Sequence, residues 1–163
     1  KYIPDPSQIT TDALNEMEFT TAFLKESLRF ASPAGVLVDR IALQDHNLGD
    51  LSVKEGTLVN IAIAGNNFNP DFHDDVDTFD PNRWITDSKT KRKLTENPRI
   101  FLPFSAGGHN CIGQHLAMNE ARIIFGLFLK KFDFVLSPNY EHKMTLRLTH
   151  EPLNRLSFKL IPK

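Results

Sequence analysis

The residue with the clearest capacity for chemistry is Cys111, the only cysteine of the chain. It lies in the segment Phe104–Gly113, where Gly107, Gly108 and Gly113 surround the thiol. Glycines let a backbone approach a flat ligand or adopt a positive φ without steric penalty. An apolar helix is expected directly after Gly113, and its free N–H groups favour negative charge on the sulfur. The spacing therefore predicts a thiolate, a soft ligand suited to iron.

The pattern around this cysteine resembles the haem-binding signature of the cytochrome P450 family of haem-thiolate monooxygenases. The matching positions are Phe104, Gly107, His109, Cys111, Gly113 and Ala117. The resemblance implies that Cys111 is the proximal ligand of the haem iron and that Phe104 packs near the sulfur. It also implies that His109 contacts a haem propionate. The family usually has arginine there, and histidine makes such a contact weaker and more sensitive to pH.

Two further segments resemble motifs of the same family, in the expected order along the chain. Glu26 and Arg29 form a Glu-x-x-Arg pair within the apolar segment Phe23–Phe30. Arg83, within Phe79–Trp84, matches the arginine that completes this pair in the family. Charges on a buried helix need partners and hydrogen bonds, so we expect Glu26, Arg29 and Arg83 to form one structural charge network. The alternative is an exposed i,i+3 pair on the helix surface.

The resemblance also points to regions further from the cysteine. An arginine in the strand after the Glu-x-x-Arg helix often meets the other haem propionate in this family, and Arg40 holds that place. Pro33–Leu37 and His150–Leu153 match regions that line the family's substrate cavity. The implied cofactor is haem b, iron protoporphyrin IX. The implied reaction inserts one oxygen atom of dioxygen into a small, mostly apolar organic substrate.

Three other roles for Cys111 fit the sequence less well. A small buried hydrophobe leaves the glycines around it unexplained. A catalytic nucleophile needs a base, which His109 or His115 would have to supply. A phosphate-binding loop lacks the Lys-Ser/Thr ending of that motif. A haem ligand accounts for the cysteine, its glycines and the other motifs together.

Composition bounds the class of protein. The chain has 163 residues, of which 40% are hydrophobic, enough for one domain with an ordinary core. A net charge of −1 argues against a nucleic-acid-binding protein, which is usually strongly basic. One cysteine excludes an internal disulfide and any zinc site built from several thiolates.

The ends of the chain bear on its place in a larger protein. Lys1–Pro6 lacks the features of a signal peptide, and the longest apolar run, Ile123–Leu129, is too short to span a bilayer. Family members are longer, and the matched motifs come from their C-terminal part. We therefore expect residues 1–163 to be the C-terminal haem-ligating part of one cytochrome P450 domain, without the N-terminal part or a membrane anchor. An anchor in that missing part would attach the protein to the endoplasmic reticulum membrane; otherwise it would be cytoplasmic.

Hydrophobic periodicity predicts the elements before the cysteine. Thr11–Phe30 has the spacing of a helix with a break near Asn15, and Pro33 ends it. Short strands and turns are expected from Val36 to Ile63, corresponding to the small β-sheet that follows this helix in the family.

After the cysteine, a buried helix is expected to reach about Lys131. The alternating segment Leu146–Leu160 is typical of a hairpin. The fold class is therefore mixed α+β, mainly helical: a cytochrome P450 fold fragment with a small sheet, a cysteine-ligand loop and the helix after it.

The polar segments allow several interpretations. Asp71–Asp80 lacks the spacing of a calcium loop and is interpreted as a solvated acidic loop. The basic run Lys89–Lys93 is expected in a loop, where it either faces solvent or steers an acidic electron-donor protein of the reductase or ferredoxin type. Four histidines are expected at the surface: His46, His73, His142 and His150.

Two functions follow from these observations. In the first, the chain is part of a monooxygenase and has no turnover alone, because the family's helix over the distal haem face is not in this sequence. In the second, it is a stand-alone haem-binding or haem-sensing module.

Overall fold

A computed structural model describes residues 9–147 and 149–163 of the chain. The α-helices are α1 (Thr11–Asn15), α2 (Glu18–Phe30), α3 (Ile63–Asn67), α4 (Lys89–Glu96) and α5 (Gln114–Lys131). Short 3-10 helices are η2 (Pro81–Trp84), η3 (Pro98–Ile100) and η4 (Gly107–His109). The strands are β1 (Arg40–Ile41), β2 (His46–Leu48), β3 (Leu51–Val53), β4 (Leu58–Val59), β5 (Phe132–Leu136), β6 (Met144–Leu146), β7 (His150–Pro152) and β8 (Phe158–Pro162). The predicted fold class, mixed α+β and mainly helical, is confirmed.

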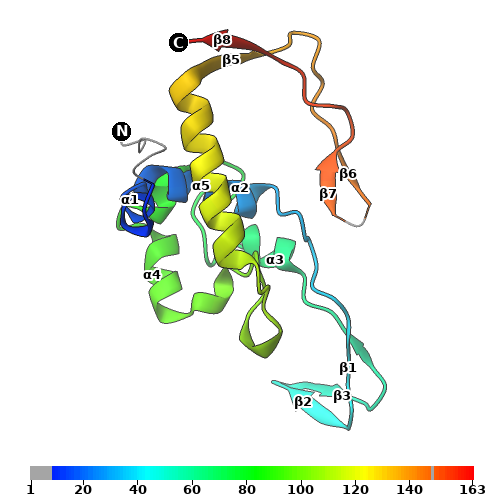
Figure 1. Cartoon of the computed structure of the whole chain (residues 1–163). Helices are drawn as coiled ribbons and strands as arrows, with labels where there is room; N and C mark the ends of the chain where they lie inside the picture. The colour runs from blue at the N-terminus through cyan, green and yellow to red at the C-terminus, as the bar shows by residue number, and fades with distance from the viewer. Residues whose placement is uncertain (1–8, 148) are drawn as a thin grey trace.

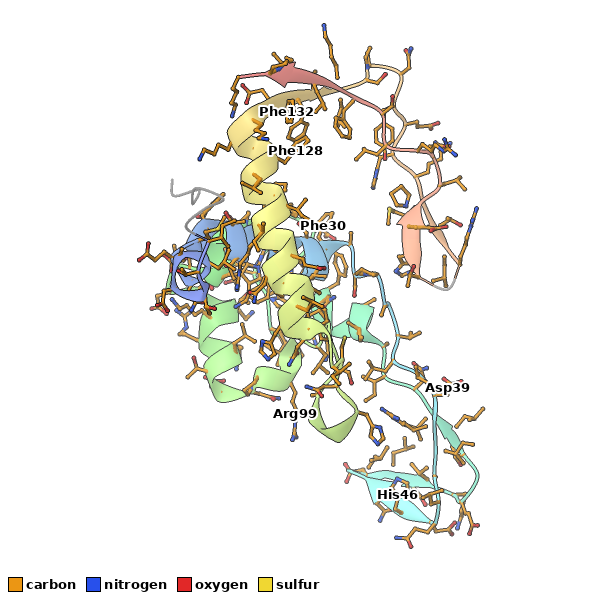
Figure 2. The ribbon with its side chains drawn as sticks, in the orientation of Figure 1. Phe30, Asp39, His46, Arg99, Phe128 and Phe132 are labelled. Carbon is orange, nitrogen blue, oxygen red and sulfur yellow. The ribbon has the colours of Figure 1, made fainter. Side chains whose placement is uncertain are left out.

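The helices form one body from which the strands extend (Figure 1). The long helix α5 runs across α2 (Figure 1), and α4 packs against η2 and η3. The strands form four antiparallel pairs: β1 with β4, β2 with β3, β5 with β8 and β6 with β7. Asp39 and His46 lie on the β1–β3 side, away from Phe30 at the end of α2 (Figure 2).

The first helical segment is broken where the sequence predicts it. Thr10 caps α1 by accepting a hydrogen bond from the Ala13 amide at 3.2 Å, and α2 begins after Met17, which is buried between the two helices. Helix α2 then packs on α5, with the Phe23 ring stacked on Phe125 at 5.1 Å between centroids. This contact places α2, with its Glu-x-x-Arg pair, directly against the helix that follows the cysteine.

The small sheet after α2 is confirmed, but its last strand is shorter than predicted. β1 pairs with β4 through Arg40 and Val59. Extended pairing continues as far as Ile61, whose carbonyl accepts from the Leu37 amide at 2.9 Å. Ile63 was expected in the strand but begins α3, because its side chain is fully buried at the start of that helix.

The helix after the cysteine ends at Lys131 as predicted, but it is not a buried helix. Only Gly126 along α5 is buried. Leu116 is 64% exposed and Ile124 is 67% exposed. The sequence predicts one apolar stripe along this helix, and in the described part of the chain α5 packs mainly against α1, α2 and β5. None of the helices in the described part of the chain combines the length and hydropathy that a membrane-spanning segment requires.

The predicted hairpin within Leu146–Leu160 is wrong in its pairing. β7 pairs with β6, whereas β8 pairs with β5 over the register Phe132–Leu136. The reason is a cluster of aromatic rings at the end of α5. The ring centroids of Phe128 and Phe132 are 5.8 Å apart, and those of Phe134 and Phe158 are 5.9 Å apart. Figure 2 shows Phe128 and Phe132 side by side where the helix meets β5. Alternation identified the strands, but this contact between distant segments selects the partners.

Candidate functional site

The cysteine lies at the end of a closed loop that leads into α5. The Cys111 amide donates to the Phe104 carbonyl at 2.9 Å and so closes the loop. Within it, Gly107 has φ +77°, a conformation that favours glycine. Gly113 caps α5, and its carbonyl accepts from the Ala117 amide at 2.8 Å in the first turn. The loop therefore holds the cysteine at the start of the helix, as the sequence predicts.

The Cys111 thiol is free and exposed. A Cβ added at Gly113 would lie 3.8 Å from its Sγ, so the sulfur lies over the helix start. Gly107 and Gly108 have open space where side chains would stand. Ile112, next to the cysteine, is completely exposed. An accessible sulfur with glycines and an apolar side chain around it can meet a flat apolar ligand.

The other residues matched to haem contacts lie in two places. Phe104, His109 and Ala117 belong to the loop and the first turn of α5; Phe104 is half-buried, and the other two are exposed. Arg40 is exposed on β1 and is paired with Val59 of β4. Among the described residues, no hydrogen bond or ion pair joins Arg40 to the cysteine loop.

The two regions matched to a substrate cavity touch each other although they lie more than a hundred residues apart. The His150 amide donates to the Pro33 carbonyl at 2.8 Å, and His150 Nδ1 lies 3.0 Å from the Ser32 carbonyl. A Cβ at Gly35 would lie only 2.6 Å from the His150 ring. Glycine at this position therefore permits the close approach of the two segments.

Glu26 is the centre of a buried charge network. Its side chain is fully buried and contacts Arg29 at 2.8 Å and Arg83 at 3.0 Å. It also accepts from the Trp84 indole N–H at 2.9 Å and from the Asp80 amide at 2.9 Å. The structure thus brings Glu26, Arg29 and Arg83 together, and the exposed surface pair is excluded.

The two guanidinium groups also hold the acidic loop. Arg29, which is fully buried, donates to the carbonyl oxygens of Asn67, Val76 and Thr78. Arg83 donates to the carbonyl oxygens of Asp74, Asp75 and Thr78. The Glu26 carboxylate faces two guanidinium groups, and the remaining N–H groups of these guanidinium groups donate to backbone carbonyl oxygens. The acidic loop is therefore held by the two arginines through its backbone carbonyl oxygens and not through its carboxylates.

Two opposing effects act on the pKa of Glu26, and their sum favours the ionised carboxylate. Burial alone would raise its pKa, because a buried charge loses its hydration. Hydrogen bonds from Arg29, the Asp80 amide and Trp84 outweigh this cost and lower the pKa of Glu26 below its usual value. The network is thus held together by the ionised acid.

His73 corrects the expectation of a surface histidine. Its side chain is 1% exposed, and its Nδ1 lies 3.0 Å from the Thr90 hydroxyl. Its Nε2 has no partner among the described residues. Burial, followed by the nearby Arg29 and Arg83, lowers the pKa of His73 to about 4. The ring is therefore neutral near pH 7, and nothing in its sequence neighbourhood signals this.

Trp84 joins the charge network to the cysteine loop. Its indole N–H is bound by Glu26, and its ring lies 4.5 Å from the ring of Phe101. Phe101 stands just before the segment that carries Cys111. The tryptophan was within a motif identified from the sequence, but its function as a bridge was not; a buried indole that needs an acceptor was the available signal.

The basic run is helical, not the predicted loop. Ser88 caps α4 by accepting from the Lys91 amide at 3.1 Å. Lys89 lies 3.7 Å from Asp74, and Arg92 lies 3.3 Å from Asp87. The sequence prediction missed the helix because the run has almost no apolar residues to mark a face.

Comparison with known proteins places this site in a family. The cytochrome P450 family model matches residues 1–159. Cytochrome P450 714C2 of Oryza sativa subsp. japonica is 38% identical over 142 residues, which are 86% of this chain and 26% of that protein. Cytokinin hydroxylase of Arabidopsis thaliana is 35% identical over 154 residues, 94% of this chain and 29% of that protein. The solved structure of a retinoic acid-bound cyanobacterial CYP120A1 has a TM-score of 0.87 at 26% identity and covers 99% of this chain, which spans 36% of that one.

The chain belongs to the cytochrome P450 family. It spans little more than a quarter of the length of the curated relatives named above. Haem is the cofactor of this family, and the residues of the cysteine loop suit it. The thiol is a soft donor and is exposed, and the space above Gly107 and Gly108 is open.

Proposed function

We propose that this chain is the C-terminal, haem-ligating part of a cytochrome P450 monooxygenase and that Cys111 is the proximal ligand of haem b. The observation that supports this proposal is the accessible Cys111 sulfur at the mouth of a glycine loop, in a chain that belongs to the family. Bound through a thiolate, haem supplies the activation of dioxygen, because the thiolate pushes electron density toward iron and favours O–O cleavage.

The chain's own residues bind and orient this group. The loop closed by the Cys111 amide and the Phe104 carbonyl holds the sulfur in place, and the half-buried Phe104 is the proposed aromatic neighbour of the sulfur. Backbone N–H groups at the start of α5 stabilise negative charge on the sulfur. His109 and Arg40 are the proposed partners of the two propionates. The exposed apolar surface beside Cys111, including Ile112 and Leu116, receives the macrocycle.

The substrate proposed is small and mostly apolar, as ligands of such cavities usually are. Support comes from the contact between Pro33 and His150, which sets two cavity-matched segments side by side. Electrons would come from a redox protein of the reductase or ferredoxin type. Two cations of α4 that would meet it, Lys91 and Arg92, are exposed, and Arg92 is paired with Asp87. Such pairs are weak, and an acidic partner can replace them.

The experiment is a reduced, carbon-monoxide difference spectrum of the haem-loaded chain, with Cys111→Ser beside it. We expect a strongly red-shifted band in the wild type and none in the variant. His115→Ala is the matched control, because His115 is an exposed potential ligand close to the same loop. Loss of the band in that control with retention in Cys111→Ser would overturn the proposal, as would a folded wild type that takes up haem without the band.

Turnover is a separate part of the proposal. We expect residues 1–163 alone to hold haem without oxidising substrate, because a monooxygenase needs a second wall over the distal face of the haem. Substrate-dependent oxygen consumption by the isolated chain, measured with an electron donor present, would refute this expectation.

A further inference from the structure

A polar cleft lies between α1, α2, α5 and the ring of Trp84, and none of its lining residues belongs to the cysteine loop. It encloses about 220 Å³. Lys25 of α2 and Arg122 of α5 both line it, together with Thr21 and Glu18. Two cations from different helices thus converge on one small space.

The two cations lack acidic partners. Arg122 donates to two neutral oxygens, Thr21 Oγ1 at 2.9 Å and Asn119 Oδ1 at 3.0 Å. Lys25 has neither a hydrogen bond nor an ion pair to any residue in the described ranges; its Nζ lies 5.8 Å from the centre of the Trp84 ring. Glu18, the one acid on the wall of the cleft, forms no ion pair with a described residue either. The cleft therefore carries net positive charge.

Lys25 and Arg122 are both half-buried, so their positive charges lie in a partly desolvated place. Burial, followed by the nearby charges of Arg122 and Lys91, lowers the pKa of Lys25. The Lys91 ammonium is held in place near Lys25 by its hydrogen bond to the Ile85 carbonyl at 2.7 Å. Half-buried cations held together in this way favour an anion between them, because the anion replaces lost hydration and offsets the repulsion.

We propose that the cleft between Lys25 and Arg122 is a binding site for a small oxyanion, a phosphate or a carboxylate group. The volume suits such a group, since it lies below the range typical of pockets for larger organic ligands. Lys25 supplies a point charge, and the Arg122 guanidinium, fixed by Thr21 and Asn119, adds directed N–H donors. The Trp84 ring forms one wall of the cleft, and its centre lies 5.8 Å from Lys25 Nζ.

The first experiment titrates the full chain with inorganic phosphate, sulfate and acetate by isothermal titration calorimetry at constant ionic strength. We expect saturable binding of one anion per chain. Lys25→Gln should weaken it at least fivefold, and Lys25→Arg should retain it. Lys159→Gln removes the same charge from β8, where the side chain is exposed and unpaired within the described chain, and should leave the affinity unchanged. Tighter binding of phosphate than acetate identifies a phosphate-type ligand, and the reverse order a carboxylate; both support the site.

The second experiment needs no variant. Acylation of lysines in the wild-type chain is followed by mass spectrometry with and without sulfate, and Lys25 should be protected selectively relative to Lys159. Equal protection of both lysines, or equal loss of binding in Lys25→Gln and Lys159→Gln, would show that the anion acts only by general screening and would overturn the proposal.

Discussion

Replacing Glu26 by glutamine tests whether the buried charge network stabilises the fold. Glutamine has the same shape, so the change removes the charge and half of the acceptor capacity and little else. The wild-type carboxylate accepts five hydrogen bonds, two from Arg29 and one each from Arg83, Trp84 and the Asp80 amide. After the change, a single amide oxygen must accept hydrogen bonds that the two carboxylate oxygens accepted before. The amide NH2 group, which can only donate, then faces N–H groups that also donate.

The expected cost is large because the charges that remain are buried. Arg29 is 0% exposed and Arg83 is 5% exposed, so water cannot replace the lost carboxylate. Breaking a buried pair by removing one partner costs about 3–5 kcal/mol. A domain is stabilised by only about 5–15 kcal/mol in total. We therefore expect Glu26→Gln to lose about 4 kcal/mol of unfolding free energy, with the acidic loop among the first segments to open.

Chemical denaturation of the full chain, followed by circular dichroism, measures this loss. Glu120→Gln is the matched control, since Glu120 is exposed on α5 and has no partner among the described residues; it should change the unfolding free energy by less than about 0.5 kcal/mol. A loss below about 1 kcal/mol for Glu26→Gln would match an exposed ion pair and would refute the reasoning from burial.

Three further outcomes are expected from the structure. The pKa of His73 is lowered from 6.5 to about 4, so the stability of the fold is highest above about pH 6.5. It falls as the unfolded chain takes up a proton between about pH 6.5 and 4, by roughly 3 kcal/mol in all. Denaturation curves across this range measure the loss, and His73→Phe should flatten the dependence. Gly107→Ala should cost about 1–2 kcal/mol by thermal unfolding because φ is +77°, whereas Gly108→Ala, with open space and no positive φ, should cost much less. Thr21→Val removes the acceptor of Arg122 Nε between α2 and α5 and should cost about 1 kcal/mol in the same assay.

Each of these has an outcome that contradicts it. A stability profile for the His73→Phe variant that still falls as steeply between pH 6.5 and 4 would assign the dependence to other groups. Equal effects of alanine at Gly107 and Gly108 would show that the positive φ is not required. An unchanged Thr21→Val variant would mean that Arg122 finds another acceptor.

Local patterns in the sequence were sufficient for the elements whose information is local. The break between α1 and α2 follows from the loss of helical periodicity near Asn15, and the cysteine loop follows from the positions of its glycines. The meeting of Glu26 with Arg83 was inferred because a charge on a buried helix requires a partner. In each case the physical requirement is visible within a few residues.

The features that were missed depend on which distant segments meet. Nothing near His73 in the sequence places Thr90 beside it, so its burial was not visible. The pairing of β8 with β5 depends on the aromatic rings at the end of α5, and alternation alone cannot choose between two candidate partners. The convergence of Lys25 and Arg122 likewise requires the packing of α2 against α5.

Trp84 shows how the two functional parts of the chain depend on each other. Its N–H satisfies Glu26, and its ring lies against Phe101, which leads into the cysteine loop. One side chain therefore links the charge network to the segment that leads into the cysteine loop. This connection explains physically why a costly buried carboxylate is useful here. Hydrophobic residues of the same volume could fill the space, but they could not fix the orientation of the indole ring, two guanidinium groups and the loop carbonyls at once.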